Sequence, residues 1–176
     1  MEHAQNCEVG PMRIQRHDYL KLLLASLLKV ATTSNSVFLE QPIVLPDRPR
    51  SNRTNAANTQ PHNAAGAPGL MASRRDPRID IRAKNLRGIG ETDDLDVRLT
   101  HLDSRSYVNS RKTVEELFED HHIKPKRDMY EEGCRQLRHR FVPFVVSTDG
   151  VLSEPAKEIV QVLATKTAEK WGMEGP

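Results

Sequence analysis

The chain has 176 residues, enough for one domain with a hydrophobic core and too few for two domains of ordinary size. A hydrophobic share of 37% beside a charged share of 28% indicates that part of the chain belongs to no core. The formal net charge of +2 neither excludes a nucleic-acid partner nor indicates the strongly basic surface of many nucleic-acid-binding proteins.

Cysteine content and hydropathy bear on the compartment. Two cysteines, Cys7 and Cys134, exclude a framework of several disulfides and favour a reducing intracellular compartment. The first residues lack the basic and apolar regions of a signal peptide, so we do not expect secretion. The most apolar stretch, residues 19–31, is interrupted by Lys21 and Lys29, so we expect no membrane span.

The first predicted element is a helix from Arg13 to about Ala31, because apolar residues recur there at helical spacing. A short strand is expected from Val37 to Glu40, ending at Gln41-Pro42. Residues 45–75 are rich in Asn, Pro, Ala, Arg and Ser and show no periodicity, so we expect a disordered insertion there.

Two segments with alternating apolar residues follow, Arg78–Lys84 and Asp94–Thr100, separated by a turn that contains Gly88 and Gly90. Together they predict a β-hairpin. The strands carry Asp80 and Asp96 among their polar positions.

Residues 113–140 are helical by composition, and Pro125 either kinks one helix or opens a second. A central strand is expected over 141–147, and a final helix over 154–171 carries Trp171 into the core. A strand, a helical crossover and another strand imply parallel pairing. The prediction is an α/β fold with the order α-β-β-β-α-β-α and a mixed sheet flanked by helices.

The hairpin offers a candidate metal site. If its apolar residues face the core, Asp80 and Asp96 emerge on the other face, and a matching register brings their carboxylates together. Close carboxylates repel unless a cation lies between them, and hard oxygen ligands suit Mg²⁺ or Mn²⁺. Such a metal activates water and stabilises charge on a phosphodiester, with Glu40 as an accessory acid. Alternating aspartates also occur on strand faces that are simply solvated.

Several segments resemble one known family. They are residues 78–83 (RIDIRA), 95–100 (LDVRLT), 106–107 (SY) and 141–150 (FVPFVVSTDG), with lead-in segments 3–7 (HAQNC), 16–18 (RHD) and 39–42 (LEQP). In this order they resemble the restriction-endonuclease-like, or PD-(D/E)xK, nuclease domains that accompany reverse transcriptases of retrotransposons without long terminal repeats. The resemblance implies a nuclease-like domain over residues 13–171, followed by a tail over 172–176.

The resemblance also implies roles for individual residues. Asp80 and Asp96 are the metal-binding acids, and Lys126 is the catalytic lysine, moved from the strand to the following helix. Tyr130 lies one turn further along the same helical face. Arg98 stands in the position of the strand lysine, where a guanidinium neutralises charge and does not act as a base. His17 is an accessory residue that lines the nucleic-acid groove.

The ends of the chain depart from the family pattern. His3 and Cys7 resemble the second half of a zinc knuckle, so residues 1–12 are interpreted as the remnant of such a lead-in. Four ligands are needed for a structural zinc site, and we therefore expect no zinc. The last residues stop where relatives continue, which suggests a fragment truncated at both ends.

Two functions follow from these patterns. The first is a Mg²⁺-dependent endonuclease of retrotransposon origin that acts on DNA, or on an RNA–DNA intermediate, in an intracellular setting with the nucleus as one candidate compartment. The second is an inactive relic of the same fold that binds nucleic acid or is only structural. Retention of both acids and Lys126 favours the first function, and Pro125 directly before that lysine favours the second.

Overall fold

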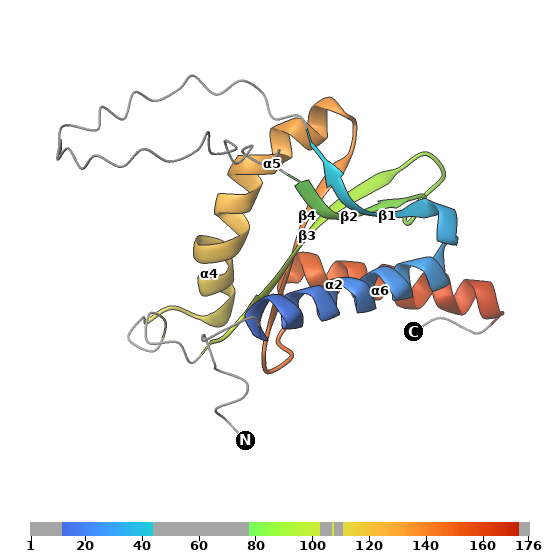
Figure 1. Ribbon diagram of the computed structural model, residues 1–176. Helices are drawn as coiled ribbons and strands as arrows, with labels where there is room; N and C mark the ends of the chain where they lie inside the picture. The colour runs from blue at the N-terminus through green and yellow to red at the C-terminus, as the bar shows by residue number, and fades with distance from the viewer. Residues whose placement is uncertain (1–11, 44–77, 103–106, 108–110, 173–176) are drawn as a thin grey trace, which may run out of the picture.

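The computed structural model describes residues 12–43, 78–102, 107 and 111–172 (Figure 1). The expected lead-in, insertion and tail lie outside these residues, apart from Met12 and Gly172. No helix in the described part of the chain is both long and apolar enough to cross a membrane. The elements are α2 (Met12–Ala31), η1 (Ser34–Ser36), β1 (Val37–Pro42), β2 (Arg78–Lys84), β3 (Thr92–Thr100), α4 (Val114–Phe118), η2 (Glu119–Ile123), α5 (Lys124–Gln136), β4 (Arg140–Ser147) and α6 (Glu154–Trp171).

The four strands form one mixed sheet in the order β1-β2-β3-β4. The first two neighbouring pairs are antiparallel, which confirms the predicted hairpin of β2 and β3. β3 and β4 are parallel, as predicted, and the segment from α4 to α5 makes the long connection that a parallel pair requires. The α/β class with a mixed sheet flanked by helices is therefore confirmed.

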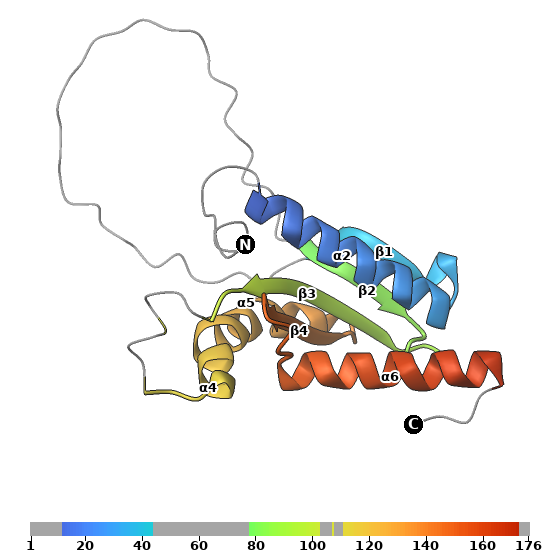
Figure 2. The same cartoon turned by 90° about the horizontal axis from the view of Figure 1, so that it is seen from below.

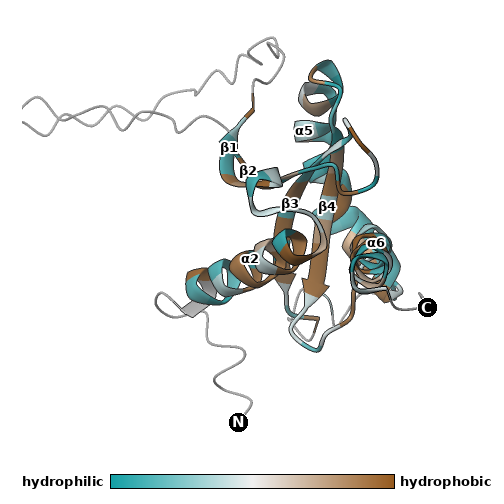
Figure 3. Ribbon diagram, turned by 90° about the vertical axis from the view of Figure 1, so that its right-hand side faces the viewer, coloured by the Kyte–Doolittle hydropathy of each residue, from teal (hydrophilic) through white to brown (hydrophobic). Residues whose placement is uncertain are grey.

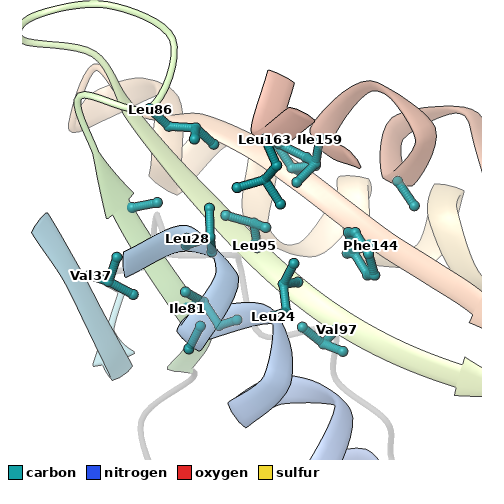
Figure 4. Packing of buried hydrophobic residues seen from close by; sticks show 14 of the residues in the cluster. Leu24, Leu28, Val37, Ile81, Leu86, Leu95, Val97, Phe144, Ile159 and Leu163 are labelled. Carbon is teal, nitrogen blue, oxygen red and sulfur yellow. The ribbon is translucent and has the colours of Figure 1, made fainter. Parts of the chain in front are cut away.

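One face of the sheet is covered by α2 and α6, which lie side by side (Figures 1 and 2). Leu24 and Leu28 of α2 reach the middle of the sheet at Ile81 and Leu95 (Figure 4). Burying a side chain of this size contributes about 1.5–3 kcal/mol, so this face holds the main core. Its other members include Val37, Ala83, Leu86, Val97, Val142, Phe144, Val146, Ile159 and Leu163.

The opposite face is covered by α4, η2 and α5. Two smaller apolar clusters lie here, one in which Val145 packs with Phe118 and Ile123, and one around Tyr130 and Cys134. β4 is hydrophobic along most of its length, as its colour in Figure 3 shows. The adjacent strand β3 differs, because it presents charged side chains toward α5 between these clusters.

The position of Pro125 decides between the two expectations for residues 113–140. Thr113 and Glu116 form a capping box that starts α4, and a π-helical turn, η2, precedes α5. The backbone remains right-handed helical at Phe118, Ile123 and Lys124, so Pro125 follows a π-helical turn within one continuous helical run and does not start a separate helix. Lys126 lies in the first turn of α5, directly after it.

The expectation that Trp171 belongs to the core is wrong. Its side chain is 65% exposed, although the helix that carries it was predicted with the correct bounds. Trp171 is the last residue of α6, before Gly172 ends the helix in a left-handed conformation. Leu163 and Ile159, about two and three turns earlier, reach the core together with Ala156.

Candidate functional site

The pairing of β2 and β3 opens at one end, and Asp80 lies in the opening. The last backbone pair of the ladder is Ile81 opposite Leu95. Beyond it, the Val97 N–H donates to Asp80 Oδ2 at 2.8 Å, and the Val97 carbonyl accepts from His17 Nε2 at 3.0 Å. The side chains of Asp80 and His17 therefore satisfy polar groups of β3 that have no partner in the β2 ladder.

His17 of α2 contacts carboxylates on both sides of its ring at this open end of the strand pair. Its Nε2 lies 3.5 Å from Asp80 Oδ2, and its Nδ1 lies 3.3 Å from Asp18 Oδ1. The hydrogen bond to Asp80 is the main reason why the pKa of His17 is raised from 6.5 to about 9, against the opposing effect of burial. His17 is consequently a cation at neutral pH, placed between two carboxylates.

Asp96 is paired with a lysine from the helix across the sheet face. Lys126 Nζ donates to Asp96 Oδ1 at 2.9 Å and lies 5.2 Å from the centre of the Tyr130 ring. The predicted helical neighbourhood of Lys126 and Tyr130 is present in α5. Burial raises the pKa of Asp96, Lys126 opposes this rise, and the negative charge of Asp80 adds to it.

The two acids do not emerge on one solvated face, as simple alternation predicts. Asp96 is only 5% exposed because α5 covers it. In β2, Ile81 packs with the α2 and α6 cluster, whereas Ile79 packs against α5, so the strand changes face between them. Asp80 lies at this change and points into the gap between β2 and β3.

A strained residue in β1 accompanies this change of face. Glu40 has a φ of 51°, and it lies between the register pairs that flank Asp80. A non-glycine residue in the left-handed region distorts a strand and costs about 1–3 kcal/mol. Such a backbone is kept where surrounding contacts hold it, and here Lys21 of α2 makes an ion pair with the Glu40 carboxylate.

The donor set of this strand end fits a hard divalent cation. The charge of Asp80 acts on Asp96 and both charges act on Tyr130, so the acids lie in one electrostatic neighbourhood. Carboxylate oxygens suit Mg²⁺, which keeps several waters and needs only one or two protein carboxylates. Among the described residues there is no group of three or more Asp, Glu, His or Cys side chains that could hold a metal. Any ion here would therefore complete its shell with water, backbone or substrate oxygens.

Two predicted accessory residues lie near the acid pair but interact with other groups. Glu40 is exposed and paired with Lys21, and no hydrogen bond or ion pair joins it to Asp80 or Asp96 within the described residues. Arg98 follows Asp96 by two positions on β3, and its charge acts on His122 of η2. The structure thus brings together Asp80, Asp96, His17, Lys126 and Tyr130.

Sequence reasoning missed a buried polar cluster around Asp94, which is fully buried on the α5 side of β3. Arg82 donates to both of its oxygens at 2.6 and 3.0 Å, and His139 Nδ1 lies 2.9 Å from Oδ2. Cys134 lies 3.6 Å from the same oxygen, and burial raises the pKa of its thiol to about 12. The signal was the Arg82 position in the hairpin, directly opposite Asp94 in register.

Cys134 and His139 belong to the Asp94 cluster, and His122 contacts Tyr107. His3 and Cys7, the expected remnant of a zinc-knuckle lead-in, lie outside the described residues.

Comparison with known proteins adds no further assignment. No protein-family model matches the chain, and no curated protein matches its sequence. We therefore infer function from the acid pair and the residues that contact it.

Proposed function

We propose that the chain is a metal-dependent endonuclease-like domain of retrotransposon origin, with a restriction-endonuclease-like fold, that acts on DNA phosphodiesters. One observation carries the proposal: Asp80 and Asp96 come from neighbouring strands to the open end of the β2–β3 pairing, where Lys126 donates to Asp96. Two carboxylates can hold the divalent ion of metal-assisted phosphodiester hydrolysis, and a lysine beside them can stabilise charge on the phosphate.

Asp80 and Asp96 are the residues that would hold Mg²⁺ or Mn²⁺. When bound, such an ion lowers the pKa of a water molecule and stabilises charge on the phosphate. Lys126 has its ammonium beside the Tyr130 ring and, once it leaves Asp96, reaches a phosphate oxygen or orients the attacking water. His17 fixes the Asp80 carboxylate in place from α2.

A second candidate is a relic that keeps the fold without cleavage. One observation favours it: both acids already have a protein cation beside them, His17 at Asp80 and Lys126 at Asp96. Paired charges of this kind are compatible with a purely structural role. In that case the domain binds nucleic acid or serves only as a folded module.

Nicking of supercoiled plasmid by the purified full chain in Mg²⁺ separates the two candidates. We expect nicking by the wild type, a loss of about a hundredfold or more in Asp96→Asn, and a loss of about tenfold or more in Lys126→Met. Asp149→Asn changes an exposed turn residue and is the matched control, with activity close to wild type.

Each outcome decides between the candidates. Equal nicking by the wild type and Asp96→Asn contradicts a reaction at this site, because the acid is then not required. A wild-type chain that is folded by circular dichroism but does not nick plasmid in Mg²⁺ or Mn²⁺ supports the relic. Loss in Asp96→Asn with full activity in Asp149→Asn supports the nuclease.

A further inference from the structure

Three charged residues alternate along the α5 side of β3, and each meets the helical segment at a different level. Asp94 meets Cys134 near the end of α5, and Asp96 meets Lys126 in its first turn. Arg98 comes next, opposite Val145 in the β3–β4 register, and Val145 packs with Ile123, the residue that follows His122 in η2. Successive residues on one strand face are about 7 Å apart, so Arg98 lies directly beyond the acid pair along the strand.

Arg98 differs from the two aspartates because it has no ionic partner among the described residues. It is half-buried, yet it makes no hydrogen bond or ion pair in the described chain. A half-buried guanidinium without an anion retains part of its desolvation cost. Its planar set of five donors matches the oxygens of a phosphate.

His122, which lies near Arg98, brings no negative charge to it. His122 is buried, and its Nε2 lies 3.0 Å from the Tyr107 hydroxyl. Burial, together with the charges of Arg98 and His121, lowers the pKa of His122 to about 4. At neutral pH, His122 is therefore a neutral hydrogen-bonding ring, in contact with the Tyr107 hydroxyl.

We propose that Arg98, with His122 and Tyr107 beside it, binds a phosphodiester of a nucleic-acid strand next to the phosphate that lies at the Asp96 site. Arg98 supplies the charge, and the neutral ring and hydroxyl supply hydrogen bonds without adding a carboxylate that would repel the ligand. The site binds a backbone phosphate and contacts no base, so it does not depend on the nucleotide sequence. This inference extends the proposed function by naming how the substrate strand is held.

The test measures binding without cleavage. A fluorescently labelled 20-base-pair DNA duplex is titrated with the full chain in EDTA, and its anisotropy is followed at several salt concentrations. We expect Arg98→Gln to weaken binding about tenfold and to reduce the slope of log affinity against log salt by about one phosphate contact. Tyr107→Phe removes a single hydroxyl and weakens binding by about threefold or less.

Arg135→Gln is the matched control, since Arg135 is exposed at the far end of α5 and pairs with Glu132. We expect its affinity to stay within about twofold of wild type. Arg98→Lys keeps the charge, so it preserves the salt slope if the variant folds as the wild type does by circular dichroism. Inorganic phosphate is added as a competitor, and a free-phosphate site is indicated if it displaces the duplex at low millimolar concentration.

Equal losses in Arg98→Gln and Arg135→Gln, or no loss in Arg98→Gln, overturn the inference, and so does displacement by free phosphate. The assay contains no divalent metal, so its result is independent of cleavage. A chain that fails to nick plasmid but loses DNA affinity in Arg98→Gln contradicts the nuclease and supports the phosphate site. A chain that nicks plasmid, and whose Arg98→Gln variant binds the duplex as tightly as the wild type, supports the nuclease and contradicts the phosphate site.

Discussion

On the side of α2 and α6, β3 presents Leu95 and Val97 to a continuous apolar cluster, whereas on the side of α5 the same strand presents Asp94 and Asp96 to cations. Both sides are buried. Burial of apolar side chains stabilises the fold directly, but buried carboxylates stabilise it only while their partners are in place. The α2 and α6 side of β3 therefore stabilises the fold through apolar packing. On the α5 side, loss of one charged partner leaves the other charge buried and destabilises the fold.

The largest effect is expected at two neighbouring residues on opposite faces. Asp94→Ala leaves Arg82 and His139 without their shared carboxylate and should cost about 3–5 kcal/mol of unfolding free energy. Leu95→Ala should cost about 2–5 kcal/mol by leaving a cavity. Urea unfolding measures both. The double replacement Arg82→Leu with Asp94→Leu removes both charges, so it should recover much of the stability lost in Asp94→Ala. Such recovery is expected only on the charged α5 side.

A cost below about 1 kcal/mol for Asp94→Ala contradicts this picture, as the buried carboxylate would then be dispensable. Failure of the pair replacement to recover stability has a different meaning. It would show that His139 and Cys134 also depend on Asp94 for their positions.

A smaller effect is expected from pH at His17. Its pKa is raised to about 9, so its stabilising contribution is fully present below pH 6.5 and is lost as the pH rises to 9. The whole shift corresponds to about 3 kcal/mol, and partial solvent exposure reduces the expected value to about 1–2 kcal/mol. Urea unfolding in EDTA at pH 6 and pH 9.5 should therefore show a larger drop for wild type than for His17→Gln.

His101→Gln is a suitable control for that comparison, because His101 lies just after β3 and contacts the Thr148 hydroxyl rather than a carboxylate. Its drop in stability between the two pH values should match that of wild type. If His17→Gln also loses as much stability as wild type, the contact with Asp80 does not hold His17 in its charged form.

The smallest effect is expected at the end of α6. Trp171 is 65% exposed, so Trp171→Ser should change the free energy of unfolding by less than about 0.5 kcal/mol. A cost of 2 kcal/mol or more would place the tryptophan in the core after all.

The local pattern of the sequence predicted most of the fold. Alternation in residues 78–84 and 94–100 gave the hairpin, and helical spacing gave both outer helices, because these signals depend on near neighbours. Lys126 and Tyr130 were placed on one helical face by the same reasoning. Trp171 was misplaced because the pattern does not say how far the sheet extends beneath a helix.

The site could be predicted only in part, because its geometry depends on a departure from alternation. The face change at Asp80, beside the strained Glu40, has no signature in the residue pattern. The roles of His17 and Lys21 depend on how α2 lies across the sheet, which is a tertiary property. The burial of Asp94 likewise depends on α5 and on Arg82.

Titration of the full chain with Mn²⁺, followed by electron paramagnetic resonance, tests most directly whether Asp80 and Asp96 share one cation. The account predicts a single Mn²⁺ site in the wild type that weakens about tenfold or more in both Asp80→Asn and Asp96→Asn, and little change in Glu40→Gln. Wild-type affinity in either aspartate variant, or no Mn²⁺ binding by the wild type, would contradict it.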